Sequence, residues 1–248
     1  VPFMFIVIVG TVSVYGLTVT ALARRLGLSD PNPQGVLLVG AQRWAREIAV
    51  ALDSAGFRVV LMDTNWENMS AARMAGLSTF YGSALSEFSV DEMDLEGVGN
   101  LLAMTPNDEV NSLAALHFSE IFGRSHVYQL PAVATESPRR ESSVRRGRQL
   151  FAGTATYQRI EQSWQRGYRI KSTKLTEEFG DDEYKSAYAE DSIPLFLVSE
   201  SGQLTVWTDE QKKPLKAGQT MIALVYEEEE PDVSAEDAAS GESEGEAS

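Results

Sequence analysis

Two residues in the first half of the chain, Gly40 and Asp63, have the types and the spacing of a pair that binds phosphate and ribose. Gly40 follows the apolar run Val36–Val39, and Asp63 follows a second run, Arg58–Met62. Asp63 lies 23 residues after Gly40, close to the ~20 residues expected in a dinucleotide-binding βαβ unit. The glycine permits a tight turn, and the helix after it offers unpaired N–H groups to a phosphate. The carboxylate can accept hydrogen bonds from ribose hydroxyls.

The glycine turn departs from the pattern G-x-G-x-x-G at its second glycine. The sequence reads Gly40-Ala41-Gln42-Arg43-Trp44-Ala45, and alanine in the third place still allows the helix to pack closely on the strand. Gln42 replaces the glycine that lets the backbone approach a pyrophosphate, so its side chain is expected to intrude there. Gln42 and Arg43 can instead bind phosphate through their side chains, Arg43 by its charge. A vestigial pocket that has lost its ligand is the alternative.

Further candidates lie at the end of the fourth predicted strand. Thr105 and Asn107 follow the apolar run Asn100–Met104, where a base or ribose could rest. Asn107 can equally cap the helix that begins beside it, and one residue can do both. Asp63 has a similar alternative, because a residue at a strand end can cap the next helix through Thr64-Asn65.

The elements that must position these residues are short apolar runs alternating with helical patterns. Five runs are predicted to form strands, the first two of them buried: Val36–Val39, Arg58–Met62, Ser78–Tyr81, Asn100–Met104 and His126–Leu130. Helices are predicted between them, beginning near Trp44 and at Trp66–Ala75, Ser86–Met93 and Asn107–Phe122. This alternation predicts an α/β fold with a doubly wound parallel Rossmann-like sheet. Ligands of such sheets bind at the carboxyl ends of the strands.

The chain changes character after the fifth predicted strand. Pro131–Gly147 is rich in arginine, serine and proline, and its arginines cluster near Arg139 and Arg145. A solvated linker is the preferred interpretation, and a contact with anionic lipid or with the acidic tail is the alternative. Beyond it, a helix at Tyr157–Arg166, a hairpin at Pro194–Trp207 and a strand at Thr220–Val225 predict a small β-rich unit.

The N-terminal run Val1–Ala23 contains no charged residue, and it is long enough for the ~20 residues of a membrane-spanning helix. Arg24 and Arg25 follow at once, and the positive-inside rule places that end in the cytoplasm. A secretory signal peptide fits poorly because the positive flank comes after the apolar run. A buried helix of a soluble protein is the second alternative. The first residue is valine, so the chain is expected to be a fragment of a longer protein or a processed chain.

Composition excludes several classes of function. The chain has no cysteine and two histidines, so neither a thiolate nor a histidine metal site is expected. Its net charge of −15 includes ten acidic and no basic residues in Glu227–Ser248, which leaves −5 for the rest. That tail is expected to be disordered. A nucleic-acid partner is not expected, since the only basic run is short. Neither His117 nor His126 lies in a recognisable catalytic motif.

The segment Val36–Leu130 resembles the RCK-type (TrkA-N-like) domains that regulate cation channels and transporters. The matching pieces are VLLVGA, VVLMDTN, FYGSA and LLAMTPNDEVNSLAALHF. The N-terminal stretch GTVSVYGLTVTALARRLGL is similar to the last transmembrane helix of bacterial sodium:proton antiporters. The region PLFLVSESGQLTVWT…LKAGQTMIALV is similar to the small β domain that follows some RCK domains.

The resemblance implies roles for several residues. Gly40 and Asp63 would hold the phosphates and adenosine ribose of NAD(H) or another adenine nucleotide. Ser83 stands where the family commonly has an acidic residue near the adenosine. The ion-binding carboxylates of antiporters lie in earlier membrane helices. RCK-like domains pair, so a homodimer is also expected.

These observations lead to one functional hypothesis and two rivals. The hypothesis is the C-terminal part of a membrane sodium or potassium:proton antiporter, with a nucleotide-sensing module on the cytoplasmic side of the plasma membrane. The rivals are a dimerising interaction module with a vestigial pocket and a soluble NAD-dependent oxidoreductase. The oxidoreductase is disfavoured because no acid/base constellation accompanies the fold, so no enzyme is expected. The expected divisions are a transmembrane helix at 1–25, a linker at 26–35, the Rossmann domain at 36–131, an Arg-rich linker at 132–149, the β-rich domain at 150–226 and the tail at 227–248.

Overall fold

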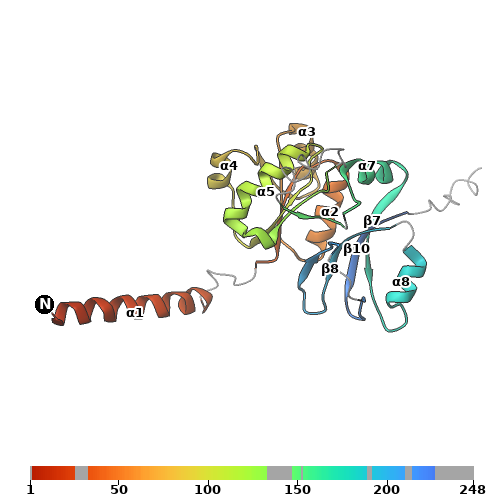
Figure 1. Ribbon diagram of the computed structural model, residues 1–248. Helices are drawn as coiled ribbons and strands as arrows, with labels where there is room; N and C mark the ends of the chain where they lie inside the picture. Colours follow the sequence, from red (N-terminus) through yellow and green to blue (C-terminus); the bar gives the residue numbers. More distant parts are fainter. Residues whose placement is uncertain are drawn as a thin grey trace, which may run out of the picture.

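The computed structural model describes residues 2–25, 33–132, 147–151, 153–188, 192–209 and 214–226. The predicted helix at the N-terminus is present as α1 (Pro2–Arg25), which extends away from the two sheets (Figure 1). Its apolar side chains are exposed, 80% for Phe3 and 67% for Ile6. Within the described residues, however, no helix meets the combined length and hydropathy expected of a membrane span. The spanning role predicted for Val1–Ala23 is therefore not confirmed.

The larger sheet is the predicted parallel one, with the strand order β3-β2-β1-β4-β5-β6. Its strands are β1 (Gly35–Val39), β2 (Val59–Asp63), β3 (Ser78–Tyr81), β4 (Val98–Ala103), β5 (Val127–Gln129) and β6 (Arg148–Gln149). The order reverses between β1 and β4, which is where open α/β sheets bind ligands. The sixth strand was not predicted: two residues at the end of the expected Arg-rich linker pair with Tyr128 and Gln129.

Helices cover both faces of this sheet, because its central strands are apolar on both sides. In β1, Val36 and Leu38 belong to one hydrophobic cluster, whereas Leu37 and Val39 belong to another. The covering helices are α2 (Arg43–Ser54), α3 (Trp66–Met74), α4 (Glu87–Glu92) and α5 (Asp108–Phe122). The predicted helices are thus confirmed, with boundaries shifted by one or two residues.

The C-terminal part forms a second, antiparallel sheet with the order β7-β10-β8-β9. Its elements are α7 (Tyr157–Gln165), β7 (Tyr168–Lys174), α8 (Asp181–Tyr188), β8 (Ile193–Val198), β9 (Leu204–Val206) and β10 (Thr220–Tyr226). The predicted hairpin is confirmed, since Phe196 pairs with Val206 and Val198 with Leu204. Strand β7 was not predicted, because its sequence YRIKSTK mixes charged and apolar residues.

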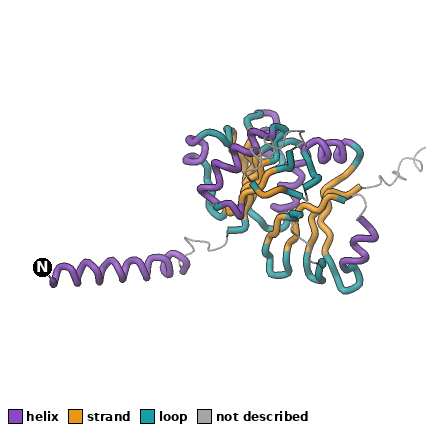
Figure 2. The backbone as a smooth tube through the Cα atoms, viewed as in Figure 1, coloured by secondary structure: helices purple, strands orange, loops and turns teal. Residues whose placement is uncertain are grey.

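The two sheets share one hydrophobic core, with α2 between them (Figures 1 and 2). Trp44 and Ile48 of α2 belong to the same buried cluster as Phe196 of β8 and Ile222 of β10. The connecting residue Phe151 is buried against Phe196, with ring centroids 5.7 Å apart. A displacement of α2 is therefore felt by both sheets. The arginines at 139–146 and the tail at 227–248 lie outside the described residues.

Candidate functional site

Gly40 forms the turn between β1 and α2, and its lack of a side chain allows this turn to approach the end of β4. Its φ of +103° is in the region that favours glycine. A Cβ atom at this position would lie 3.0 Å from the carbonyl oxygen of Met104 and 3.0 Å from Oε1 of Gln42. The N–H group of Met104 in turn donates to the carbonyl of Val39 at 2.8 Å. Gly40 is thus required by the backbone conformation as well as by the close contact.

The side chain of Gln42 spans the switch point between β1 and β4. Its Nε2 donates a 2.6 Å hydrogen bond to the carbonyl of Met104. Gln42 precedes α2 as the N-cap residue, but its side chain makes no capping hydrogen bond. The intrusion expected from the sequence therefore takes a specific form: the side-chain amide of Gln42 reaches from the β1–α2 turn to the end of β4.

Asp63 holds the β1–α2 turn and the start of α3 together. Its Oδ2 accepts from the N–H of Ala41 at 2.8 Å and from Nδ2 of Asn68 at 3.0 Å. Its Oδ1 accepts from the N–H of Asn65 at 2.9 Å, while Asn65 itself caps α3. Since each carboxylate oxygen can accept about two hydrogen bonds, Oδ1 retains capacity for a ribose hydroxyl.

Arg46 adds a second guanidinium group one turn after Arg43. Its Nη1 donates to the carbonyl of Ala41 at 2.7 Å. Burial, and then the neighbouring charge of Arg43, lower the pKa of Arg46, while Glu47 and Asp63 act in the opposite direction. Arg43 is exposed on the first turn of α2. The two charges and the N-terminus of α2 give this turn the positive potential that a phosphate requires. Arg46 was missed, although its place three residues after Arg43 was a usable signal.

Thr105 and Asn107 have structural partners at the end of β4. Oδ1 of Asn107 accepts from the N–H groups of Glu109 and Val110, at 2.9 and 3.1 Å, and so caps α5. The Thr105 hydroxyl and N–H both bond to Oδ1 of buried Asn111, at 2.8 and 2.9 Å. The capping interpretation of Asn107 is therefore confirmed. Asn111 was missed because no sequence pattern distinguishes a buried asparagine from an exposed one.

Ser83 lies in the loop after β3, which is joined to the end of β2. The N–H of Gly82 donates to the backbone carbonyl of Asp63 at 3.1 Å, which holds the two loops side by side. The Ser83 hydroxyl accepts from the N–H of Leu85 at 3.2 Å. The structure thus gathers the predicted residues at one edge of the sheet, and Ser83 contributes a neutral hydroxyl there.

The antiparallel sheet with α7 and α8, here called the second unit, contacts α2 near this edge of the parallel sheet through α7. Nε1 of Trp44 donates to Oε2 of Glu161 at 3.1 Å, and the Trp44 ring lies 5.7 Å from that of Tyr157. Burial raises the pKa of the Tyr157 hydroxyl, and the negative charges of Glu161 and Asp63 raise it further. The contacts of Glu161 and Tyr157 with Trp44 thus attach α7 to the first turn of α2, the helix that begins at the glycine turn.

The arrangement suits the binding of an anion more than a chemical step. It presents backbone N–H groups, two guanidinium groups and a hydrogen-bonded carboxylate. No set of three or more histidine, cysteine or acidic side chains that could hold a metal ion occurs within the described part of the chain.

Comparisons with known proteins give one match to a family. The sequence model of the TrkA-N domain matches residues 36–147. Among curated proteins, none matches this chain.

Three solved structures illustrate the structural likeness. The NAD(P)-binding domain of an exopolyphosphatase-related protein from Archaeoglobus fulgidus is 18% identical, with a TM-score of 0.37 over 45% of this chain and 80% of that one. The TrkA-N domain of the inner membrane protein ybaL from Escherichia coli is 17% identical, with a TM-score of 0.40 over 55% and 98%. The GsuK channel bound to NAD is 14% identical, with a TM-score of 0.40 over 89% of this chain and 43% of that one.

The sequence match agrees with the parallel sheet and with its strand order, which reverses between β1 and β4. Residues 36–147, which make up less than half of the chain, match the TrkA-N domain family.

Proposed function

We propose that this chain is the nucleotide-sensing regulatory part of a membrane monovalent cation:proton antiporter that exchanges sodium or potassium. The observation that carries the proposal is the glycine turn at Gly40, with Asp63 hydrogen-bonded to it through Ala41 and with α7 of the second unit attached to the helix that follows it. The role is regulatory and not enzymatic, because the site offers binding groups without a nucleophile or an acid/base pair. The module lies on the cytoplasmic side of the plasma membrane.

The ligand is NAD(H) or another adenine nucleotide. Its phosphates lie over the N-terminus of α2, next to Arg43 and Arg46, and its adenosine ribose bonds to Asp63. The negative charge of Asp63 repels a 2′-phosphate, so NADP binds less tightly than NAD. Gln42 must first release the carbonyl of Met104. That hydrogen bond contributes about 0.5–1.5 kcal/mol net, so breaking it lowers the affinity by up to about tenfold. The expected dissociation constant is micromolar to millimolar, roughly −8 to −4 kcal/mol.

The ligand acts on the second unit through α2. A ligand that displaces Gln42 changes the first turn of α2, and Trp44 in that turn donates to Glu161 of α7. The core shared by the two sheets transmits the same displacement. Both are physical contacts, so the ligand biases the position of the antiparallel sheet relative to the parallel one.

Attachment to a transporter is supported by the sequence of α1 and by the TrkA-N domain. The helix resembles the last membrane helix of antiporters, and it exposes apolar side chains. The partner of α1 is an upstream transmembrane domain of the same protein. The regulatory parts of two copies pair as a homodimer. A reporter fused after Gly35 should be active on the cytoplasmic side of the membrane. Recovery of the whole chain in the soluble fraction after a carbonate wash would contradict the membrane attachment.

Calorimetry on the full chain in a non-ionic detergent tests whether a nucleotide binds and which one binds most tightly. NAD, NADH, NADP, AMP and ATP are titrated in turn, and NADH or NAD is expected to bind with the highest affinity. Gly40→Ala is the variant that should remove binding, because its Cβ would collide with the carbonyl of Met104. Glu92→Lys changes an exposed residue on α4, outside the site, and should leave binding unchanged. Absence of binding by all five nucleotides opposes a sensing role.

A second candidate function rests on the Gln42–Met104 hydrogen bond, which occupies the switch point without a ligand. In this case the TrkA-N domain dimerises and binds no nucleotide. Light scattering on the full chain should show a dimer at roughly tens of micromolar under either hypothesis. Failure of Gln42→Gly to bind any nucleotide favours the interaction module.

A further inference from the structure

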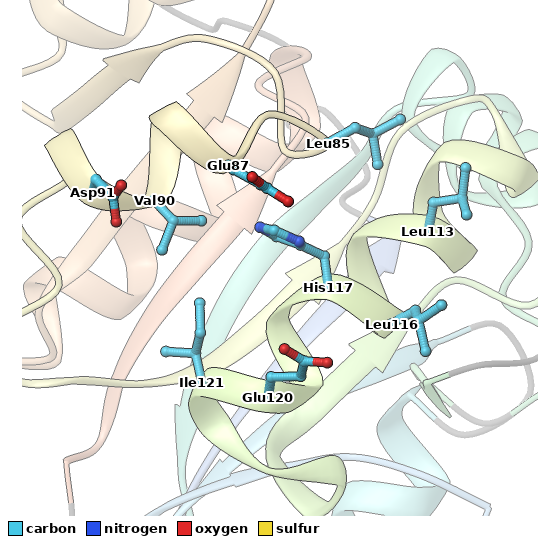
Figure 3. Close-up of a pocket in the computed structure, with 9 residues that line it drawn as sticks. All are labelled: Leu85, Glu87, Val90, Asp91, Leu113, Leu116, His117, Glu120 and Ile121. Atoms are coloured by element: carbon cyan, nitrogen blue, oxygen red, sulfur yellow. The ribbon is translucent and has the colours of Figure 1, made fainter.

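A groove of about 720 Å³ lies between α4 and α5, on residues that the nucleotide site does not use. Three carboxylates border it: Glu87 and Asp91 from α4, and Glu120 from α5. Figure 3 shows the α4 carboxylates on one side of the groove and Glu120 on the other. No lysine or arginine is among the described residues that line it. The groove therefore carries a negative potential along both edges.

The α5 side of the groove is apolar. Leu113, Leu116 and Ile121 are 51%, 46% and 45% exposed, and together they line the groove. Leu116 and Ile121 lie on either side of Leu113 around the helix axis, so the three form one broad apolar stripe over about 12 Å of helix. The opposite face of α5 is already buried on the sheet through Ala114, Ala115 and Phe118. A helix that is apolar on two faces needs a second partner.

His117 lies on the same stripe, and the Nε2 atom of its ring is buried without a hydrogen-bond partner. Its ring packs edge-on against Phe118, with centroids 5.4 Å apart. Figure 3 shows the ring in the middle of the groove, between α4 and α5. Buried polar atoms are almost always paired in native proteins. Because this atom is not exposed even with the groove empty, His117 forms part of the groove wall, and its Nε2 is not a contact point for an occupant.

We propose that this groove binds a basic amphipathic helix of a partner protein. The apolar side of that helix packs on Leu113, Leu116 and Ile121, and its lysine or arginine side chains face the carboxylates of α4 and α5. This is the helix-in-groove mode of recognition, in which apolar anchors provide affinity and flanking charges provide orientation.

Charge distinguishes this occupant from a second copy of the chain. Symmetric pairing through the groove would bring three carboxylates from each copy together. Like charges placed opposite each other oppose association. The uncharged run of α1 would match the leucines but leave the carboxylates without partners. A basic helix is the occupant that satisfies both features.

The test uses the full chain in a non-ionic detergent and a fluorescent synthetic peptide of about 18 leucine and lysine residues, roughly 27 Å long as a helix. Fluorescence anisotropy should give a micromolar dissociation constant, and binding should weaken as salt shortens the screening length. Asp91→Lys and, independently, Glu120→Lys should weaken binding by about tenfold. Leu116→Ser should weaken it by a similar factor.

Matched controls lie outside the groove. Glu92→Lys makes the same charge change on the adjacent residue of α4, and Met74→Ser removes an exposed apolar side chain of α3. Both should change the dissociation constant by less than about twofold. Circular dichroism should first confirm that each variant is folded. Equal binding by wild type, Asp91→Lys and Leu116→Ser would overturn the proposal. So would a change of oligomeric state in Asp91→Lys, because the groove would then be an interface between copies.

Discussion

The side-chain amide of Gln42 donates a 2.6 Å hydrogen bond to the backbone carbonyl of Met104. The two residues come from the ends of neighbouring parallel strands, β1 and β4, between which the strand order reverses. A side chain thus occupies the position that ligands take in related folds. Any nucleotide must displace this amide, so Gln42 controls the affinity of the site.

Gln42→Gly should raise the affinity for NAD by roughly tenfold. The substitution removes the crowding side chain and the hydrogen bond that binding must break, which contributes about 0.5–1.5 kcal/mol. Gln42→Glu is the matched variant: it keeps the size of the side chain but places a negative charge beside the phosphates. It should bind NAD more weakly than wild type in the same calorimetric titration. Unchanged affinity in Gln42→Gly would show that crowding does not limit binding.

Asp63→Ala should erase the preference for NAD over NADP and also destabilise the fold. The carboxylate accepts three hydrogen bonds from Ala41, Asn65 and Asn68, so its loss should lower the free energy of unfolding by about 2–3 kcal/mol. Asn68→Ala serves as control, because it removes one of these hydrogen bonds without touching the ribose site. It should lower stability less and keep the preference for NAD, as chemical denaturation and calorimetry can show.

The Trp44–Glu161 hydrogen bond predicts that the two units unfold together. Glu161→Ala should lower the free energy of unfolding by about 1 kcal/mol and so lower the denaturation midpoint. Glu161→Gln keeps an acceptor oxygen, so its midpoint should stay near that of the wild type. Saturating NAD should also change the fluorescence of Trp44. Loss of that change in Trp44→Phe, but not in Trp207→Phe, would assign the signal to α2. Two separate unfolding transitions in the wild-type chain would contradict this prediction.

Alkaline pH should destabilise the second unit through Tyr184. Burial raises the pKa of its hydroxyl to about 12, whereas an unfolded tyrosine ionises near 10. The stabilisation is complete below pH ~10 and is lost as the pH rises toward the folded value, by about 2–3 kcal/mol. Tyr184→Phe keeps the ring and lacks the ionising group, so its free energy of unfolding should fall less between pH ~10 and ~12. Tyr226→Phe, at an exposed residue, should behave as wild type in denaturation measured across this range.

Several parts of the fold could be predicted from local signals. The apolar strand ending in Gly40 identified β1, and Asn107 before an apolar pattern identified the start of α5. The hairpin around Gly202 followed from a turn between two apolar runs. In each case the interactions join residues close in sequence, or the burial leaves a periodic pattern.

Other features could not be read from the chain. β7 carries no clear alternation, and its place beside β10 depends on an antiparallel pairing far along the sequence. The buried amide of Asn111 and the groove between α4 and α5 also left no distinguishing pattern. Each depends on which surfaces the folded chain brings together.

The sequence by itself determined the alternating α/β pattern, the glycine turn and the acidic residue that follows β2, because strand and helix periodicities and turn chemistry are local. The tertiary structure decided that Gln42 bonds to Met104, that Asp63 holds the turn after β1, and that α7 contacts Trp44 of α2. These contacts join residues distant in the chain. The first two exist only after the parallel strands lie side by side, and the third only after α7 has packed on α2.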